Sequence, residues 1–513
     1  MAISLATAPA LAAPPPDIDK FVGQVLQRFG TPGMSLAIVE GGKTVHAKAY
    51  GVREAGKPGL ADAHTIFPIG SETKAFTAAA LGILVDQGKL KWEDTVVAHM
   101  PDFQMFDPYA TAHMTVRDLL THRSGLGLGQ GDLLIIPTTD RSRLDIVHAL
   151  RYLQPKTGFR ESYAYDNILY IVAGQLVEAV SGQRWEDFVR ANIFKPAGMS
   201  DASPGYDATE RANHASLHAR TDEAIRGNGN LRVLKTGLER RTSAPAGAIY
   251  ASATDMARWM SVLTGGGTAP GGKEIFSGKV LADLWSPVVV IPRDPVPAAI
   301  AETAANIDTY ALGWNIRDYR GHKIVTHSGA VLGAVSVIAI IPEKNVGISV
   351  AINSEDGVAR WSVFYHLLDH YLGLEPLDWP AKYEAARKEI VAKGAEAMKT
   401  LPPEIRPNSN FSFPLASYAG VYRDPWYGTM TISSKDKGLW ITFDRTPGME
   451  GPLEPVADDT FRTRWTDRMI EDAYVKFELS PDKRITGVKM WPVSPLADFS
   501  FDYRDLAFVP EQR

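Results

Sequence analysis

The sequence of 513 residues contains no cysteine. This absence excludes disulfides, thiolate nucleophiles, iron–sulfur clusters and cysteine-based zinc sites. Neither sign of charge dominates, because 54 lysines and arginines stand against 59 aspartates and glutamates, and the formal net charge is −5. This balance argues against a dedicated nucleic-acid binder, which needs concentrated basic charge to neutralise phosphates. Any nucleophile of this protein must therefore be an oxygen or an amine.

The sequence also lacks an apolar run of the roughly 18 residues that a spanning helix needs, so we expect no membrane span. Residues 1–16 are rich in alanine and end in three prolines, and Ala10-Leu11-Ala12 matches the A-x-A pattern of a signal cleavage site. The basic start of such a signal is missing. We expect a periplasmic or secreted protein whose signal begins upstream. If the segment is only a flexible tether, a cytoplasmic location is expected.

The length predicts two or more domains, at about 100 to 200 residues each. Within residues 17–380, strand patterns lie at both ends and helical patterns lie between them, which predicts an α/β domain with an antiparallel sheet. The predicted strands are Met34–Val39, Lys43–Lys48, Ala334–Ile341 and Val346–Ile352, and the main predicted helices are Glu72–Asp86 and Asn167–Val180.

Residues 381–410 are helix-forming and then rich in proline, which predicts a linker. The sequence pattern changes in residues 411–513, where short runs of alternating apolar and polar residues are separated by Gly, Pro and Asp turns. This pattern predicts a small all-β barrel. The runs are Thr429–Ile432, Leu439–Phe443, Tyr474–Leu479, Ile485–Trp491 and Asp498–Tyr503.

One tetrapeptide carries the pattern of a nucleophilic site. Ser71-Glu72-Thr73-Lys74 opens an apolar helix, and residues three apart on a helix share a face. The ammonium of Lys74 can therefore lie beside the hydroxyl of Ser71. Serine needs such a neighbour to take its proton before it can attack a carbonyl. The tetrapeptide alone is weak evidence, because serine at a helix start with a lysine one turn later is common.

Two further motifs strengthen this interpretation. Tyr165-Asp166-Asn167 precedes a predicted helix, and His327-Ser328-Gly329 precedes the late strand pair. The set S-x-x-K, Y-x-N and H-x-G resembles the serine β-lactamase and penicillin-binding-protein superfamily, in the form seen in class C β-lactamase-like esterases and D-aminopeptidase-like peptidases. The resemblance extends over roughly residues 17–375. It implies a transpeptidase-like domain, with helices on both faces of the sheet and a helical subdomain.

The resemblance also implies residue roles. Ser71 would attack the carbonyl and form an acyl-enzyme, and Lys74 would help to take its proton. Tyr165 would act as general base and then acid, provided that a cation such as Lys74 favours the phenolate, since a phenol has a pKa of about 10. Asn167 would orient Lys74 and bind the substrate amide. The backbone N–H groups of Ser71 and Ala330 would form the oxyanion hole.

His327 and Gly329 are expected to bind substrate, and His327 is the departure from the family. Penicillin-binding proteins and true β-lactamases have Lys-Thr-Gly at this motif, where the lysine helps to hold a carboxylate. A histidine, with a reference pKa of about 6.5, is mostly neutral at pH 7. We therefore expect β-lactam hydrolysis to be at most a side activity.

The predicted function is a serine hydrolase that cleaves peptide or amide bonds, or esters, in small substrates, with small linear peptides favoured. A carboxylesterase and a slowly acylating penicillin- or peptide-binding sensor are the alternatives. The C-terminal domain resembles the lipocalin-like appendages of some of these peptidases and would affect substrate access or oligomerisation. No cofactor is expected. His366 and His370 share a helix face but lack the glutamate and third ligand of a zinc site, so no metal is expected.

Overall fold

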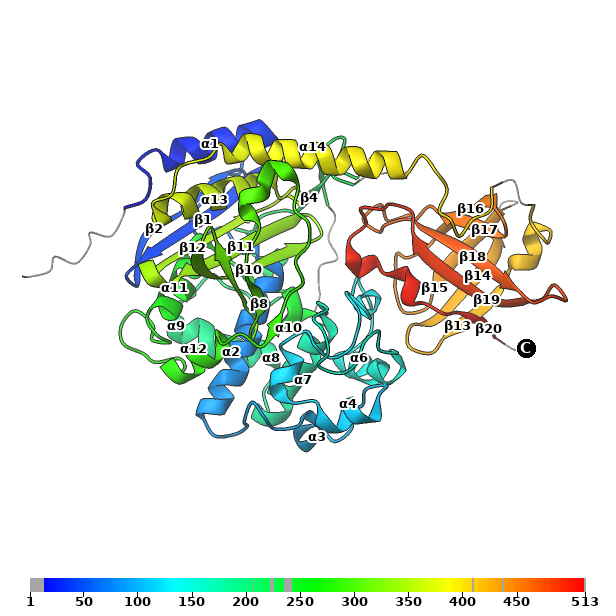
Figure 1. Cartoon of the computed structure of the whole chain (residues 1–513), viewed down its shortest axis with the longest axis horizontal. Coiled ribbons are helices and arrows are strands. Elements are labelled where there is room, and N and C mark those ends of the chain that lie inside the picture. Colours follow the sequence, from blue (N-terminus) through cyan, green and yellow to red (C-terminus); the bar gives the residue numbers. More distant parts are fainter. Residues whose placement is uncertain are drawn as a thin grey trace, which may run out of the picture.

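The computed structural model describes residues 13–205, 207–221, 226–234, 242–407, 410–435 and 438–511. They form a large α/β domain and a smaller β-barrel that lies beside it (Figure 1). The candidate signal residues Ala10, Leu11 and Ala12 fall outside the described residues.

The large domain is built on an antiparallel sheet of eight strands in the order β2-β1-β12-β11-β10-β9-β8-β7. The first and last parts of the domain meet at its centre, where β1 pairs with β12 from Met34↔Ile352 to Glu40↔Val346. The expected antiparallel sheet is therefore confirmed. Its strands are β1 (Gly33–Glu40), β2 (Lys43–Gly51), β7 (Val289–Val290), β8 (Asp308–Tyr310), β9 (Asn315–Tyr319), β10 (His322–Val331), β11 (Ala334–Ile341) and β12 (Val346–Ile352).

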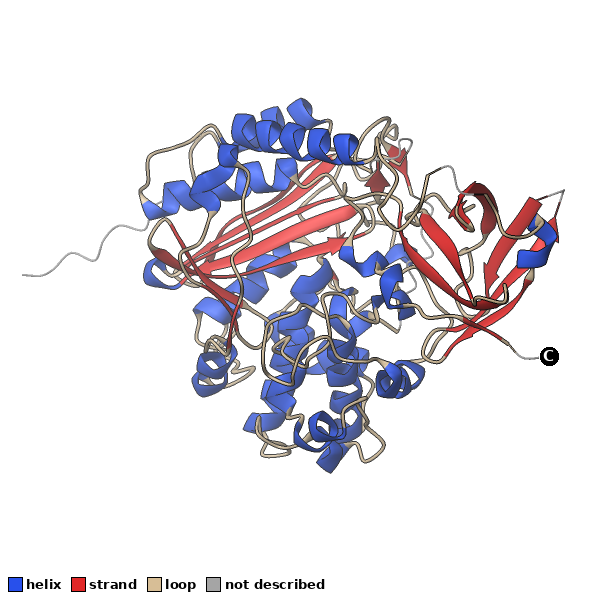
Figure 2. Ribbon diagram, turned by 45° about the vertical axis from the view of Figure 1, so that its right-hand side comes forward, coloured by secondary structure: helices blue, strands red, loops and turns tan. Residues whose placement is uncertain are grey.

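Strands β1, β11 and β12 are buried along their whole length, because helices cover both faces of the sheet (Figure 2). This explains why their sequences read as continuous apolar runs rather than alternating ones. One face packs against α1 (Ile18–Phe29), α13 (Val358–Leu372) and the start of α14 (Trp379–Ala397). The other face packs against α2 (Thr73–Asp86) and α11 (Ala253–Thr264), beyond which lies the expected helical subdomain.

The helical subdomain is centred on α7 (Ile168–Ser181), which packs against α2. Its helices and the neighbouring ones are α3 (Val96–His99), α4 (Pro108–His113), α5 (Val116–Leu119), α6 (Arg143–Ala149), α8 (Trp185–Val189), α9 (Lys195–Ala197), α10 (Ala244–Gly247) and α12 (Gly278–Leu284). Small paired strands, β3 (Phe67–Pro68) with β6 (Tyr250–Ala251) and β4 (His218–Ala219) with β5 (Arg232–Val233), complete the domain.

The C-terminal domain is a nearly closed antiparallel barrel in the order β19-β18-β17-β16-β15-β14-β13-β20. A bridge between Val488 and Phe508 brings its two ends together. The barrel expected from the sequence is confirmed. Its strands are β13 (Gly420–Asp424), β14 (Gly428–Lys435), β15 (Gly438–Phe443), β16 (Gly451–Ala457), β17 (Thr460–Thr463), β18 (Ala473–Leu479), β19 (Ile485–Pro492) and β20 (Val509–Pro510).

The strand predicted at Asp498–Tyr503 is wrong. This segment forms two short 3₁₀ turns, η9 (Phe499–Phe501) and η10 (Tyr503–Asp505). The side chain of Asp498 accepts a hydrogen bond from the N–H of Ser500 at 2.9 Å, and Asp502 caps Arg504 in the same way at 3.1 Å. Aspartates that bond to the backbone two residues on favour turns, and this overrides the alternation of aromatic residues.

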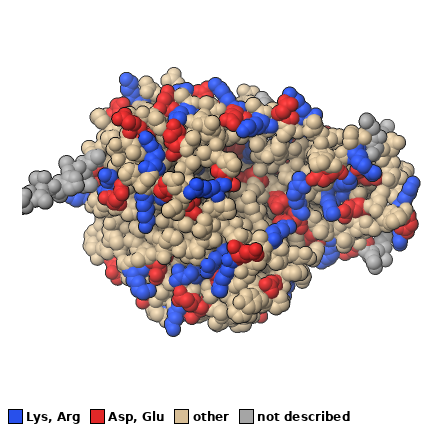
Figure 3. Space-filling view, viewed as in Figure 1, with Lys and Arg blue, Asp and Glu red and all other residues tan. Residues whose placement is uncertain are grey.

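The surface carries no concentration of one charge on the face shown in Figure 3, where basic and acidic side chains are interspersed. Among the described residues, none of the helices has both the length and the apolar character that crossing a bilayer requires.

Strand β10 lies very close to the short turn that precedes α2. The 3₁₀ turn η1 (Gly70–Glu72) joins β3 to α2, and the hydroxyl of Ser336 on β11 donates to the carbonyl of Ile69 at 2.9 Å. A Cβ atom at Gly329 would lie 1.9 Å from that carbonyl oxygen. Glycine at this position is therefore a steric requirement for the approach of η1 to the sheet.

We predict that Gly329→Ala destabilises the large domain by about 1–3 kcal/mol, because the added methyl must push η1 away from β10. The measurement is the thermal unfolding midpoint. Gly23→Ala is the matched control: Gly23 lies inside α1 with nothing near its missing side chain, so the change should stabilise by about 0.5–1 kcal/mol. A Gly329→Ala variant with the midpoint of the wild type would contradict the close approach.

Candidate active site

The three sequence motifs meet in one place. Ser71 lies in η1 and Lys74 in the first turn of α2, and Lys74 Nζ lies 3.0 Å from Ser71 Oγ. Asn167 ends the loop before α7, and its Oδ1 accepts a hydrogen bond from Lys74 Nζ at 2.6 Å. The spacing of residues three apart on one helix thus produces the contact that the sequence predicts. Ser71 is half-buried, whereas Lys74 is fully buried.

The surroundings of Lys74 fix the direction of its hydrogen bonds. Its third neighbour is the backbone carbonyl of Ala246 in α10, at 3.0 Å. The carbonyl of Ala246 and the Oδ1 atom of Asn167 can only accept hydrogen bonds. When Lys74 is a neutral amine, these two acceptors take its two N–H groups. Its lone pair is then left facing the hydroxyl of Ser71, which is the arrangement a base requires.

Burial also favours the neutral amine. It lowers the pKa of Lys74 to about 7, and the carboxylates of Asp132 and Asp166 oppose part of this shift. Burial raises the pKa of Tyr165 well above 10, against the effect of its hydrogen bond with Ser71. The expectation that Lys74 favours a phenolate at Tyr165 does not fit this pattern. In the free protein, Lys74 is the group better suited to take the proton of Ser71.

Tyr165 lies over the lysine and packs among aromatic rings. Lys74 Nζ lies 4.8 Å from the centre of its ring. His122 contacts one side of Tyr165, with ring centres 4.3 Å apart, and Phe499 of the C-terminal domain contacts it edge-on at 5.9 Å. His122 is fully buried and accepts a hydrogen bond at Nδ1 from the N–H of Asp166 at 3.2 Å. These contacts enclose the ring of Tyr165, whose side chain is hydrogen bonded to Ser71.

His327 is buried rather than exposed to the cleft. Its Nε2 is hydrogen bonded to the hydroxyl of Tyr310 at 2.9 Å, and its Nδ1 lies 2.7 Å from the carbonyl of Ser328. Burial lowers the pKa of His327 to about 3, so the ring is neutral. The structure therefore gives His327 a packing role against Tyr310, and it supplies no positive charge for a substrate carboxylate.

The predicted oxyanion hole lies where η1 and β10 meet. A Cβ built on Gly70 would lie 2.5 Å from the backbone nitrogen of Ala330, so the backbone before Ser71 and the backbone of Ala330 are adjacent. The pairing of β9 with β10 ends at Thr326↔Asn315, and Ala330 on the next part of β10 is exposed. An open strand edge thus runs beside Ser71.

Sequence reasoning missed two polar residues of this centre. Asp132 starts the 3₁₀ turn η2 (Asp132–Leu134) and is fully buried, and its Oδ2 accepts a hydrogen bond from Asn167 Nδ2 at 2.7 Å. The hydroxyl of Ser500, from the C-terminal domain, donates to the same oxygen at 2.8 Å. The glycines at 125, 127, 129 and 131 are a signal that could have indicated a loop just before Asp132. No local signal marked Ser500, which lies in the segment predicted as a strand.

A groove of about 720 Å³ lies beside this centre, between the two domains. Gly127, Leu128 and Lys156 contribute from the large domain, and Phe499 separates the groove from Tyr165. Its remaining lining is mainly apolar and comes from residues within 397–404 and 491–504 and from Tyr474.

His366 and His370 do not form a metal site. The ring of His366 stacks on Phe21 with centres 4.0 Å apart, and Nε2 of His370 is bonded to the carbonyl of Ala13 at 2.8 Å. Within the described ranges, no group of three or more His, Asp or Glu side chains is placed to hold a metal ion.

Comparison with known proteins agrees with this geometry. The family model described as Beta-lactamase matches residues 18–362, and the one described as Domain of unknown function (DUF3471) matches residues 406–510. Unguisins hydrolase ungD' of Aspergillus campestris is 30% identical over 91% of this chain and 87% of its own length. Penicillin-binding protein 4 of Amycolatopsis lactamdurans is 26% identical over 67% of this chain and 85% of its own length.

Among solved structures, the octameric penicillin-binding protein homologue from Pyrococcus abyssi aligns with a TM-score of 0.59 and 21% identity, over 96% of this chain and 99% of that one. The likeness extends through the barrel and shows a shared fold. Because the Beta-lactamase model covers well over half of the chain, this protein belongs to the β-lactamase family and is a serine hydrolase of that family.

Proposed function

We propose that this serine hydrolase cleaves peptide or amide bonds of small substrates through an acyl-enzyme on Ser71, with small linear peptides as the favoured class. The observation that carries the proposal is the contact of Ser71 Oγ with Lys74 Nζ at 3.0 Å, beside the open edge of β10. An extended peptide can pair with such an edge through its own N–H and C=O groups. The adjoining groove has the volume of a small-ligand site.

The chemistry follows from the hydrogen bonds. Neutral Lys74 takes the proton of Ser71 as Oγ bonds to the substrate carbonyl carbon. The backbone N–H groups of Ser71 and Ala330 stabilise the oxyanion. When the C–N bond breaks, the amine leaves with a proton passed from Lys74 through Tyr165, whose raised pKa keeps it protonated. A water molecule then attacks the ester carbon and gives a proton to the same groups. The bond from that carbon to Ser71 Oγ breaks, Ser71 takes the proton back, and the acid is released.

The alternatives differ in substrate and in the second step. A carboxylesterase would use the same residues with an alcohol as leaving group. A sensor would stop at the acyl-enzyme. We expect β-lactams to be recognised weakly, because the buried and neutral His327 supplies no cation for the carboxylate of a β-lactam. We further propose that the protein is exported.

The first test is product release from a panel of L- and D-peptide anilides, a linear peptide, a short-acyl nitrophenyl ester and a chromogenic cephalosporin. The wild type should turn over the peptide substrates, and Ser71→Ala should reduce the rate by several orders of magnitude. Thr264→Ala, a change at the end of α11 away from Ser71, is the control and should retain activity. Turnover of the ester alone would identify a carboxylesterase, and undiminished activity of Ser71→Ala would reject the nucleophile.

The second test is the pH dependence of Ser71 reactivity towards a fluorophosphonate. Because the pKa of Lys74 is about 7, its neutral fraction falls about tenfold for each pH unit below 7, and the labelling rate should fall with it. Lys74→Met removes the titrating amine, so labelling should be slow and independent of pH. Tyr165→Phe should keep the acidic limb of the profile. If the labelling rate of Lys74→Met still falls towards acidic pH as in the wild type, a group other than Lys74 controls that pH dependence.

A further inference from the structure

The C-terminal domain reaches the catalytic centre through one polar side chain. Ser500 lies 368 residues from Asp132 in the sequence, yet the two side chains are hydrogen bonded, and Ser500 is buried. From Ser500 a continuous series of hydrogen bonds of 2.8, 2.7, 2.6 and 3.0 Å runs through Asp132, Asn167 and Lys74 to Ser71.

We propose that Asp132 and Ser500 are positioning residues of the active site, which together hold Asn167 in the orientation that directs Lys74 towards Ser71. The C-terminal domain is then a working part of the catalytic centre. This role rests on the proposed function of Ser71 and Lys74.

The amide of Asn167 could present either its oxygen or its nitrogen to Lys74. With Nδ2 turned towards the lysine, the amide would donate a hydrogen bond to the amine lone pair and compete with Ser71. The carboxylate of Asp132 accepts from Nδ2 and so keeps Oδ1 on Lys74. Asp132 thus determines the direction of every hydrogen bond that follows.

Asp132 in turn needs Ser500. A buried carboxylate is costly unless hydrogen bonded, and burial raises the pKa of Asp132 to about 7. The hydrogen bonds from Ser500 and Asn167 oppose this rise. The second oxygen of Asp132, Oδ1, is buried and accepts no hydrogen bond from any residue that the structure describes. Without Ser500, the carboxylate would keep Asn167 alone as its donor.

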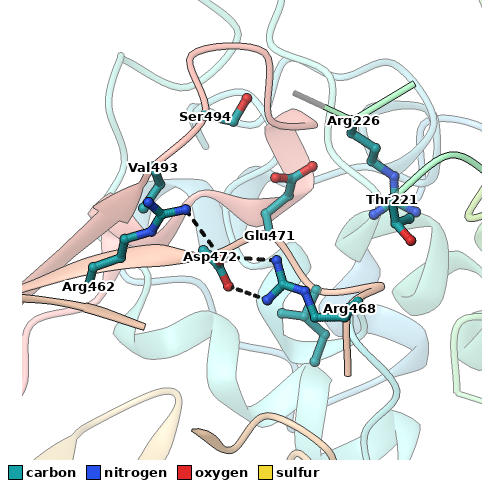
Figure 4. Close-up of a pocket in the computed structure, with 9 residues that line it drawn as sticks. Thr221, Arg226, Arg462, Arg468, Glu471, Asp472, Val493 and Ser494 are labelled. Carbon is teal, nitrogen blue, oxygen red and sulfur yellow. Dashed lines mark hydrogen bonds and ion pairs between the residues drawn. The ribbon is translucent and has the colours of Figure 1, made fainter. Parts of the chain in front are cut away.

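The barrel holds Ser500 firmly in place. The connection after β19 begins at Val493, whose N–H donates to the carbonyl of Asp472 at 2.8 Å. Figure 4 shows the side chain of Asp472 between Arg462 and Arg468, at 3.5 and 2.8 Å. Further along the connection, the hydroxyl of Tyr503 donates to the carbonyl of Glu471 at 2.8 Å.

Contacts between the domains hold the barrel against the large domain near this point. Three side-chain contacts join the domains: Arg226 Nη1 with the carbonyl of Met469 at 2.7 Å, Lys156 with Asp505 at 2.7 Å, and Arg445 with Asp140 at 2.6 Å. The contact of Lys156 with Asp505 lies on the connection itself. The position of Ser500 therefore follows from docking of the whole domain and does not depend on Ser500 alone.

Other titratable groups face the Lys74–Asp132 pair and must stay unchanged in the test. They are Tyr165 and Asp166 from the loop before α7, Tyr170 from α7, His122 from the loop after α5 and His327 from β10. Both histidines are buried, and burial lowers the pKa of each below the ordinary value of a histidine, so the neutral ring is favoured in both.

The test compares fluorophosphonate labelling of Ser71 across pH in the full-length wild type, Ser500→Ala and Asp132→Asn. The Asp132 charge raises the pKa of Lys74, so Asp132→Asn should move the acidic limb to lower pH. Loss of the Ser500 hydroxyl favours protonated Asp132. Ser500→Ala should therefore also move the acidic limb of the pH profile to lower pH, but by a smaller amount than Asp132→Asn. The maximal rate of Ser500→Ala should fall about three- to tenfold, as for the loss of one hydrogen bond.

The double variant isolates the connection between the two residues. In the Asp132→Asn background, Ser500→Ala should move the limb no further, because no carboxylate remains to protonate. Ser434→Ala, an exposed serine of β14, is the matched control and should behave as the wild type. If the acidic limb of Ser500→Ala lies at the same pH as that of the wild type, the proposal is overturned, whether or not the labelling rate or the thermal midpoint of the variant falls. If the wild type is not labelled at all, the nucleophile assignment fails instead, and this role fails with it.

Discussion

The structure of the catalytic centre depends on one buried amine. Removing a lysine head group from water costs several kcal/mol unless each of its hydrogen bonds is replaced. Lys74 meets this constraint with partners from η1, the loop before α7 and α10. Segments that are far apart in sequence must therefore come together before the lysine can be buried. The sheet, the helical subdomain and the connection to α10 are all fixed in relation to this contact.

The same burial sets the chemistry. In water a lysine has a pKa of about 10.4 and is a poor base at neutral pH because it already holds its proton. Burial removes this obstacle, while the nearby carboxylates keep the pKa from falling too far. Burial changes the pKa of Tyr165 in the opposite direction, because the charged form of a tyrosine is the anion. The same burial thus makes Lys74 a proton acceptor and keeps Tyr165 a proton donor.

Much of this arrangement follows from local sequence patterns. The apolar runs of β1, β11 and β12 and the turn residues between them predicted the sheet, and the spacing of Ser71 and Lys74 predicted their contact. The buried state of His327 was beyond reach, because it depends on a ring from β8 that no local pattern connects to it. Which of two candidate groups accepts the proton was equally hidden, since burial decides it.

The failed strand prediction at Asp498–Tyr503 has the same origin. Alternating aromatic residues indicated a strand, but the aspartates between them bond to their own backbone and form turns. Phe499 packs against Tyr165 of the other domain, whereas Phe501 and Tyr503 are buried, and the hydroxyl of Tyr503 donates to the carbonyl of Glu471 within the barrel. A segment whose partners lie in another domain cannot be interpreted from its own pattern alone.

The separation of 368 residues between Ser500 and Asp132 also has a consequence for synthesis. A ribosome releases the chain from its N-terminus, and domains fold as they emerge. The last strand of the large sheet, β12, ends at Ile352, so every strand of that sheet leaves the ribosome well before the last part of the barrel. A nascent or truncated chain can therefore contain the whole sheet and still lack the contact that completes its centre. Activity would arise late, once the whole polypeptide is made.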